Sequence, residues 1–256
     1  MANALGVPSP DKVEYMADAA ELGRDYKHQL LTSLDLRHGD TVLDVGCGPG
    51  MDLPVMADAV TTSGRVIGID VEPAMVAAAR SLLNYYPQVE VRQGDAHALP
   101  VDDGTADRAR MDRALQHVEN PSGVLAELHR ALKPGGLLRI AEPDWDALVV
   151  DGDLEMNRAF NRFVCSTMVR NATIGRRLGR LARDAGFEVE DVRAATTVLR
   201  DFARADYTFA LSRNTERAIR AGAIDRADGE RWLAELRDGG FQASVTIFLL
   251  SARKPL

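Results

Sequence analysis

The sequence contains little cysteine and no long apolar run. Its 256 residues include two cysteines, Cys47 and Cys165, too few for a disulfide scaffold or a cysteine-based metal site. The longest apolar run, Val245 to Leu250, is interrupted by Thr246 and is far too short to cross a bilayer. The N-terminus lacks a basic region followed by an apolar stretch, the pattern of a signal peptide. We therefore expect a cytoplasmic protein with no bound metal and no membrane partner.

Positive charge is also scarce. The chain carries 31 Lys and Arg against 38 Asp and Glu, so its formal net charge is −7. Such a balance does not attract polyanions, so nucleic acid is not an expected partner. The arginine-rich segment 176–238 holds 13 Arg but also 12 acidic residues, which favours a solvated helix face over an anion site. The 46% of hydrophobic residues supports a sizeable core.

Short apolar runs alternate with helix-like segments from residue 41 onward. The expected strands are Thr41–Val45, Arg65–Ile69, Val89–Arg92, Ala106–Met111, Leu137–Ala141, Glu188–Leu199 and Ser244–Ala252. Pro73 and Pro121 stand near the starts of two intervening helices. Buried runs separated by helices indicate βαβ units and a parallel sheet. The expected fold class is therefore α/β, with a doubly wound, seven-stranded, mostly parallel sheet and helical cap insertions.

This alternation divides the chain into six parts. They are a helical lead-in or cap (1–40, helical from about Lys12), a ligand-binding core (41–142), a cap insertion (143–173), a helix and strand that complete the core (174–199), a helical cap insertion (200–240) and the last core strand (241–256). The two insertions look mainly helical. Long insertions at strand ends usually build lids or binding surfaces, and plain packing helices are the alternative.

The strongest motif is a glycine turn after the first expected strand, Val42-Leu43-Asp44-Val45-Gly46-Cys47-Gly48-Pro49-Gly50. Glycine lets the backbone turn tightly and lets a ligand approach the main chain. The helix that follows offers unpaired N–H groups at its start. Asp70 ends the second expected strand, where a carboxylate accepts the ribose hydroxyls of an adenosine ligand.

Two classes of adenosine ligand compete for this motif. A dinucleotide fingerprint needs a third glycine at the position of Met51. Asp44, inside the motif, faces a diphosphate unfavourably and suits an ammonium group. S-adenosylmethionine has an ammonium group and no phosphate. A nicotinamide-dependent oxidoreductase remains the alternative enzyme, and a non-catalytic cofactor-binding protein the alternative outside enzymes.

Two further motifs extend the pattern, Gly94-Asp95-Ala96-His97-Ala98-Leu99-Pro100 and Leu132-Lys133-Pro134-Gly135-Gly136. With them, residues 40–142 resemble the class I S-adenosylmethionine-dependent methyltransferases. The chain is most similar to the ubiquinone/menaquinone-biosynthesis (type 11) methyltransferases. The resemblance implies a Rossmann-like fold and S-adenosyl-L-methionine as cofactor.

The resemblance also implies a set of cofactor contacts. Asp70 would bind the ribose, Asp95 the adenine amino group, and Asp112 would approach the methionine portion. Tyr26 and Lys27 would close over the cofactor. The implied cofactor-binding residues are Tyr26, Asp44, Gly46, Cys47, Gly48, Gly50, Asp70, Val71, Met75, Asp95, Ala96, His97, Met111 and Asp112.

The chemistry of methyl transfer demands few fixed groups. The reaction is an in-line displacement at a sulfonium, so the protein mainly aligns the partners and excludes water. A base is needed only when the nucleophile holds its proton tightly. His117, after the fourth expected strand, is the candidate catalytic base because imidazole titrates near neutrality. Local hydrogen bonding, or holding the cofactor, is its alternative role.

Candidate acceptor contacts follow the fifth expected strand. Glu142 and Asp144 suit an amine or hydroxyl, and Trp145 an aromatic or cationic wall. A capped turn with a buried Trp is the alternative. The residues Phe160, Phe163, Met168, Tyr207 and Phe209 fit the core better than a pocket.

The expected function is methyl transfer to O, N or activated C of a small molecule. No Asn-Pro-Pro-Tyr-type segment, a feature of methyltransferases acting on planar amino groups in nucleic acids or glutamine, follows the fourth expected strand. A specialised metabolite is the favoured acceptor, and C-methylation of a quinone precursor is the alternative. We expect a monomer or homodimer.

Overall fold

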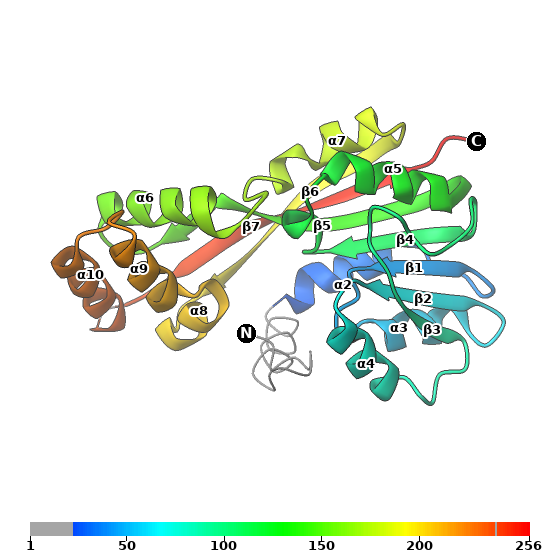
Figure 1. Ribbon diagram of the computed structural model, residues 1–256, viewed down its shortest axis with the longest axis horizontal. Helices are drawn as coiled ribbons and strands as arrows, with labels where there is room; N and C mark the ends of the chain where they lie inside the picture. The colour runs from blue at the N-terminus through cyan, green and yellow to red at the C-terminus, as the bar shows by residue number, and fades with distance from the viewer. Residues whose placement is uncertain (1–22, 239) are drawn as a thin grey trace.

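Seven strands form one sheet in the order β3-β2-β1-β4-β5-β7-β6 in the computed structural model, which describes residues 23–238 and 240–256 (Figure 1). The strands are β1 (Thr41–Val45), β2 (Arg65–Asp70), β3 (Val89–Gln93), β4 (Ala106–Asp112), β5 (Leu132–Val150), β6 (Glu188–Leu199) and β7 (Ala243–Arg253). β1 to β5 pair in parallel, whereas β7 is antiparallel to both β5 and β6. The expected α/β class with a seven-stranded, mostly parallel sheet is confirmed.

Helices cover both faces of this sheet. They are α2 (Arg24–Ser33), α3 (Leu53–Val60), α4 (Pro73–Leu82), α5 (Pro121–Ala131), α6 (Leu154–Phe163), α7 (Leu178–Asp184), α8 (Phe202–Phe209), α9 (Leu211–Arg220) and α10 (Arg226–Asp238), with the short turns η1 (Leu115–His117), η2 (Val164–Met168, a π-helix) and η3 (Gly175–Arg177). Residues 1–22 of the expected lead-in lie outside the described residues. Within the described part, no helix is both long and apolar enough for a membrane span.

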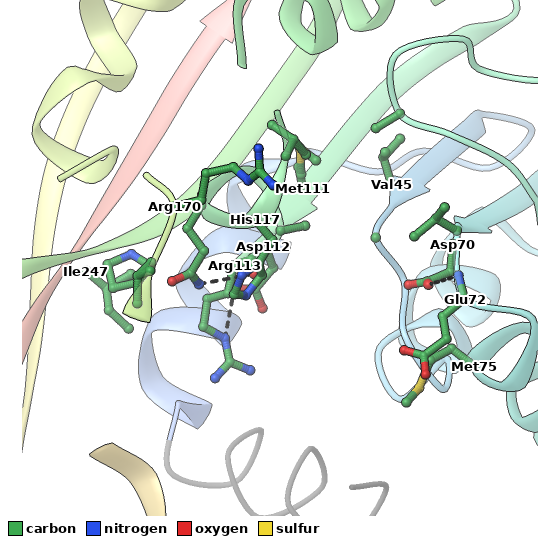
Figure 2. Close-up of a pocket in the computed structure, with 18 of the residues that line it drawn as sticks. Val45, Asp70, Glu72, Met75, Met111, Asp112, Arg113, His117, Arg170 and Ile247 are labelled. Carbon is green, nitrogen blue, oxygen red and sulfur yellow. Dashed lines mark hydrogen bonds and ion pairs between the residues drawn. The ribbon is translucent and has the colours of Figure 1, made fainter. Parts of the chain in front are cut away.

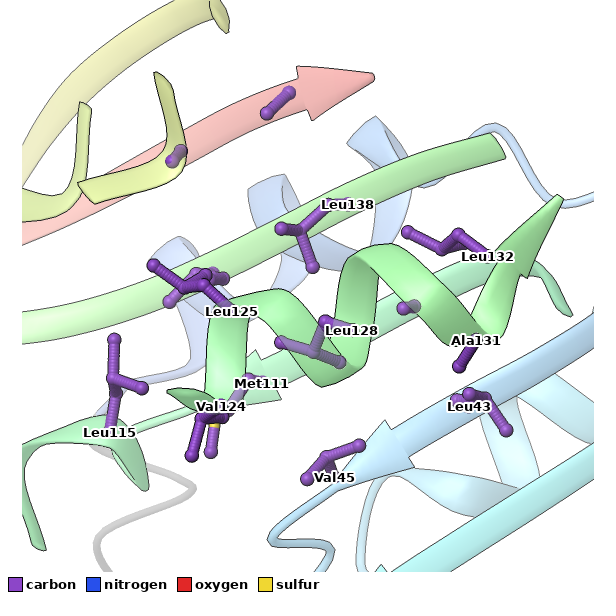
Figure 3. Packing of buried hydrophobic residues seen from close by; sticks show 14 of the residues in the cluster. Leu43, Val45, Met111, Leu115, Val124, Leu125, Leu128, Ala131, Leu132 and Leu138 are labelled. Carbon is purple, nitrogen blue, oxygen red and sulfur yellow. The ribbon is translucent and has the colours of Figure 1, made fainter. Parts of the chain in front are cut away.

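Helix α5 shows how local sequence and packing agree. Its start is capped by Asn120, whose side chain accepts the N–H of Gly123, and Pro121 occupies the first turn. The apolar face of α5 packs on β1, β4 and β5 through fully buried residues (Figure 3). They include Leu43, Met111, Val124, Leu125, Leu128 and Leu138. Alternate residues of β1, such as Val42, face the other side of the sheet, where α3 and α4 lie.

The last three strands in the sheet order continue beyond the core. Their far ends carry α6, α8, α9 and α10 at one end of the molecule (Figure 1), around a second core that contains Phe160 and Trp232. The expectation that the insertion 143–173 is mainly helical was wrong at its start, because β5 runs on to Val150. Val149 and Val150 pair with Ser244 and Ala243 of β7. This extension places residues of β5, β6 and β7 above the ligand edge of the core.

Candidate active site

A cavity of about 880 Å³ opens at the carboxyl ends of the parallel strands. It is centred where the strand order reverses between β1 and β4, which is where open α/β sheets bind ligands. Figure 2 shows two facing walls. One wall carries Val45, Asp70, Glu72 and Met75, and the other carries Met111, Asp112, Arg113, His117 and Arg170.

The glycine turn keeps the crevice between β1 and β4 open. Gly46 has φ +75°, and a Cβ atom there would lie 2.5 Å from the Cβ of Ala114. Both the positive φ and the close approach therefore require glycine. The N–H of Gly46 donates to the carbonyl of Ile69 at 2.7 Å, which ties the turn to β2.

Asp70 joins the glycine turn to the start of α4. Its Oδ2 accepts the N–H of Gly48 at 2.9 Å, and its Oδ1 accepts the N–H of Glu72 at 2.9 Å. The carboxylate is thus held in one orientation at the cavity wall. Each oxygen accepts one hydrogen bond from these backbone groups and retains a lone pair for a ligand hydroxyl.

Asp95 and His97 form a second anchored pair at the same end of the cavity. Asp95 Oδ1 accepts the N–H of His97 at 2.9 Å and lies 2.7 Å from His97 Nδ1. These hydrogen bonds from His97 lower the pKa of Asp95. His97 Nε2 accepts the N–H of Asn120 at 3.1 Å. Nε2 is then unprotonated, so Nδ1 carries the proton and donates it to Asp95.

Behind the β1–β4 crevice lies a buried ionic network. Arg110 donates to Asp44 at 2.9 Å, to Asp52 at 2.6 Å and to Asp112 at 3.0 Å. Lys27 bonds to Asp52 and lies 2.7 Å from Asp112. Three carboxylates therefore surround two cations.

Burial and pairing act differently on the network's carboxylates. Burial raises the pKa of Asp44, whose side chain is 3% exposed. Although burial opposes it, the charges of Lys27, Arg113 and Arg110 hold the pKa of Asp112 well below its usual range. Asp112 thus stays ionised at the cavity wall. The Tyr26 hydroxyl donates to Asp112 at 3.2 Å, and burial raises the pKa of that phenol.

Most of the expected cofactor residues line the cavity. These are Tyr26, Gly46, Asp70, Val71, Met75, Asp95, Ala96, His97, Met111 and Asp112. Asp44, Cys47, Gly48 and Gly50 lie outside the lining. The Asp44 carboxylate points to Arg110 instead of into the cavity. Lys27 was expected to close over the cofactor, but its ammonium group forms ion pairs with Asp52 and Asp112. Cys47 is buried against Leu53, and burial raises its thiol pKa.

The expected acceptor contacts separate by strand alternation. Pro143 and Trp145 line the cavity, whereas Glu142 and Asp144 point to the opposite side of β5. Asp144 is fully buried and pairs with Arg176, with Nη2 to Oδ1 at 2.8 Å. The structure therefore places Glu142 and Asp144 in buried, structural positions outside the cavity lining, where they do not contact a substrate. Strand alternation in the sequence could have indicated this separation, because residues two apart on a strand, such as Glu142 and Asp144, share a face.

Trp145 is fixed in the cavity by a residue that the sequence pattern did not single out. Its indole Nε1 donates to Gln116 Oε1 at 2.8 Å, and Gln116 Nε2 donates to the carbonyl of Arg113 at 3.2 Å. Its ring meets Phe209 of α8 edge to face, with centroids 6.3 Å apart. For Phe209 the core was the favoured expectation and a pocket the alternative; it belongs to the second core and also lines the cavity. His117, at the end of η1, lines the same wall and is exposed.

Comparisons with known proteins agree with this geometry. A family described as a methyltransferase domain matches residues 36–186. The chain is 49% identical over 247 residues to an uncharacterized 37.1 kDa protein in transposon TN4556 of Streptomyces fradiae, covering 95% of this chain and 72% of that one. It is 36% identical over 126 residues to a 2-phytyl-1,4-naphtoquinone methyltransferase of Thermosynechococcus vestitus, covering 48% of this chain and 56% of that one. It thus spans about half the length of that relative.

A solved structure shares the fold. The crystal structure of a SAM dependent methyltransferase from Aquifex aeolicus superposes with a TM-score of 0.55 at 21% identity, covering 88% of each chain. The match to the methyltransferase domain spans the glycine turn, Asp70, Asp95 and η1. It confirms the resemblance found in the sequence, together with S-adenosyl-L-methionine as the cofactor. The chain belongs to the class I S-adenosylmethionine-dependent methyltransferase family.

Proposed function

We propose that this protein transfers a methyl group from S-adenosylmethionine to O, N or activated C of a small-molecule acceptor. The observation that carries the proposal is the division of one cavity into two chemically different halves. One half, at the ends of β2 and β3, presents the carboxylates of Asp70, Glu72 and Asp95. The other half is apolar and aromatic, with Trp145 and Phe209. The two halves suit a cofactor and an acceptor bound side by side.

The acidic half fits the cofactor. Asp70 would hold the ribose hydroxyls, and Asp95, with Ala96 and His97 beside it, would hold the adenine. Gly46 leaves the crevice free of a Cβ where the methionine portion would pass, because a side chain there would meet Ala114. Asp112, kept ionised by its neighbours, would favour the positively charged portion. When bound, the cofactor supplies an electrophilic methyl group on a positively charged sulfur.

The protein's own part is to align the acceptor and manage its proton. Trp145, held by Gln116, gives the acceptor a rigid wall. The cofactor, held by Asp70 and Asp95, would supply the methyl group to the acceptor's electron pair, and its sulfur would keep the electron pair of the carbon–sulfur bond. His117, on the cavity wall, accepts a proton from the acceptor when the nucleophile carries one.

Within this proposal the chain divides as its sequence pattern indicates. Residues 41–142 bind the cofactor, and the segments 143–173 and 200–240 select the acceptor. Residues 174–199 and 241–256 complete the core, and 1–40 stay the expected lead-in or cap, of which 1–22 lie outside the described residues. A specialised metabolite is the favoured acceptor. C-methylation of a quinone precursor is the second candidate, supported by similarity to the quinone methyltransferase of Thermosynechococcus vestitus over 48% of this chain. The protein would act in the cytoplasm on a small molecule, as a monomer or homodimer, without nucleic acid.

Calorimetry and a labelling assay test the proposal. S-adenosylhomocysteine is expected to bind, and NAD is not. Incubation with methyl-labelled cofactor and a fractionated extract of small metabolites is expected to give a labelled product. Binding of NAD without S-adenosylhomocysteine would instead favour an oxidoreductase. Cofactor binding with no label transfer to any fraction would favour a non-catalytic binding protein.

A further inference from the structure

The part of the cavity lining that comes from position 143 onward contains one charged side chain. Among the described residues from position 143 onward, ten line the cavity, and they include Trp145, Arg170 and Phe209. Only Arg170 in this set is charged. The carboxylates of the lining belong to other parts of the wall. They are Asp70, Glu72 and Asp95 at the cofactor end, Asp112 in the buried network, and Glu119 beside Asn120, the residue that donates to His97.

The backbone around Arg170 is fixed on both sides. The N–H of Val169 donates to the carbonyl of Val164 at 3.2 Å, closing the π-helix η2. The N–H of Asn171 donates to the carbonyl of Gln116 at 3.0 Å, and its side-chain amide donates to the carbonyl of Val118 at 2.8 Å. Arg170 is therefore anchored to the segment that carries His117 and faces the cavity from the same wall (Figure 2).

Arg170 also has no carboxylate partner in residues 23–238 and 240–256. Asp144 and Asp146 of β5 are already paired, because Arg176 bonds to both. On the wall, Arg113 lies 3.6 Å from Asp112. Arg170 lines the cavity and is itself exposed, so its guanidinium is accessible to an anion. Its planar group bonds two oxygens of one anion at once.

We propose that the acceptor is an apolar molecule bearing a single anionic group, with its carboxylate or phosphate oxygens paired to Arg170. Its apolar body lies against Trp145 and Phe209, whose edge-to-face contact makes a fixed aromatic wall. The acidic cofactor half repels the anion, which orients the acceptor in the cavity. This proposal rests on the function proposed above and names the class of acceptor.

Matched aromatic probes test the proposal on the 256-residue chain saturated with S-adenosylhomocysteine. The probes are 2-naphthoate, its neutral isostere 2-naphthamide, and 2-naphthyl phosphate, each titrated by calorimetry. The variants are Arg170→Gln and, as a matched control, Arg180→Gln, which removes an exposed arginine of α7 outside the cavity lining. Because charged hydrogen bonds are the strong ones, we expect wild type to prefer an anionic probe over naphthamide by about tenfold to hundredfold. Arg170→Gln should abolish that preference, and Arg180→Gln should keep it.

The outcomes are distinguishable. Tighter binding of naphthoate than of naphthyl phosphate indicates a carboxylate-bearing acceptor, and the reverse order indicates a phosphate-bearing one. Equal binding of naphthamide and both anions, including no measurable binding of any probe, overturns the anionic class. A preference that survives in Arg170→Gln overturns the role of Arg170. Failure of S-adenosylhomocysteine itself to bind contradicts the proposed function, so that failure is separate from the failure of the acceptor class.

Discussion

The Glu142 carboxylate at the ligand end of β5 accepts the backbone N–H of Leu115 at 2.5 Å. The backbone N–H groups of Gln116 and Ala114 also point to it. Glu142 is fully buried, and its position beneath η1 supports the turn that carries Gln116 and His117. Burial raises the pKa of Glu142 to about 8, although the backbone donors oppose the shift.

Glu142→Gln is expected to change how stability depends on pH. Its carboxyl has a folded-state pKa of about 8 against an ordinary value of 4.5, so the folded state binds the extra proton between these values. The free energy of unfolding therefore falls as pH rises through this window, by up to about 1.4 kcal/mol per pH unit from this group. Glutamine does not ionise and removes this term. Urea unfolding from pH 5 to 9 measures it. The exposed Glu188→Gln serves as control, and identical pH slopes for wild type and Glu142→Gln would contradict the prediction.

Arg110→Met is expected to destabilise the fold strongly. The substitution leaves Asp44, Asp52 and Asp112 buried or half-buried with Lys27 as their remaining partner in the network. Breaking one side of a buried pair costs about 3–5 kcal/mol. Urea unfolding at neutral pH measures the loss.

The matched control for Arg110→Met is Arg193→Met. Arg193 pairs with Asp191 on the surface, with its side chain 73% exposed. Exposed pairs contribute about 0–1 kcal/mol, so this variant should stay close to wild type. Equal stability of the two variants would mean that the buried network does not hold the β1–β4 crevice together.

Asp70→Ala is expected to weaken binding of S-adenosylhomocysteine by about 1–3 kcal/mol, the cost of the lost hydrogen bonds to the ribose. It also removes the acceptor of the Gly48 and Glu72 N–H groups, so part of the loss comes from a looser turn. Calorimetry measures the affinity, and thermal unfolding separates the two effects. The exposed Asp184→Ala in α7 is the control. Unchanged affinity in Asp70→Ala would show that the ribose binds elsewhere.

His117→Ala is expected to lower turnover by about a hundredfold or more while cofactor affinity stays the same, because it removes a proton acceptor rather than a cofactor contact. The assay uses whichever acceptor takes up label from the methyl-labelled cofactor. His28→Ala is the control, since His28 is exposed on α2 and lies outside the cavity lining. Unaltered turnover across the pH range would remove His117 as the base.

Local patterns in the sequence were sufficient to predict the glycine turn and the strand ends that line one side of the cavity. The glycine turn, Asp70 at the end of β2 and the cap at Asn120 and Pro121 each depend on neighbours in the chain. Their conformations follow from φ preferences and from backbone hydrogen bonds that form over a few residues. The strand pattern also predicted β6 and β7 to within one residue at each end.

Side-chain surroundings were predicted less well. Asp44 lies in the most informative motif, yet its partner is Arg110, 66 residues further along the chain. Glu142 and Trp145 are three residues apart on β5, but one is a buried support and the other a cavity wall. Because successive side chains on a strand point to opposite faces, alternation decides which of the two is buried and which lines the cavity. The sequence predicted a turn and then a helix after Ala141, so it did not show that the strand, and with it the alternation, continues to Val150.

The sequence by itself determined an α/β sheet, a glycine turn with acidic residues at the strand ends, and the methyltransferase family. These follow from short-range patterns because the backbone turn and the strand ends are encoded locally. The tertiary structure alone decided that Lys27 and Arg110 neutralise the acidic side chains behind the crevice, and that the long strands β5 to β7 bring Trp145, Phe209 and Arg170 to one cavity. Those contacts join residues far apart in the chain, and only packing and burial set which charges are paired and which face the ligand.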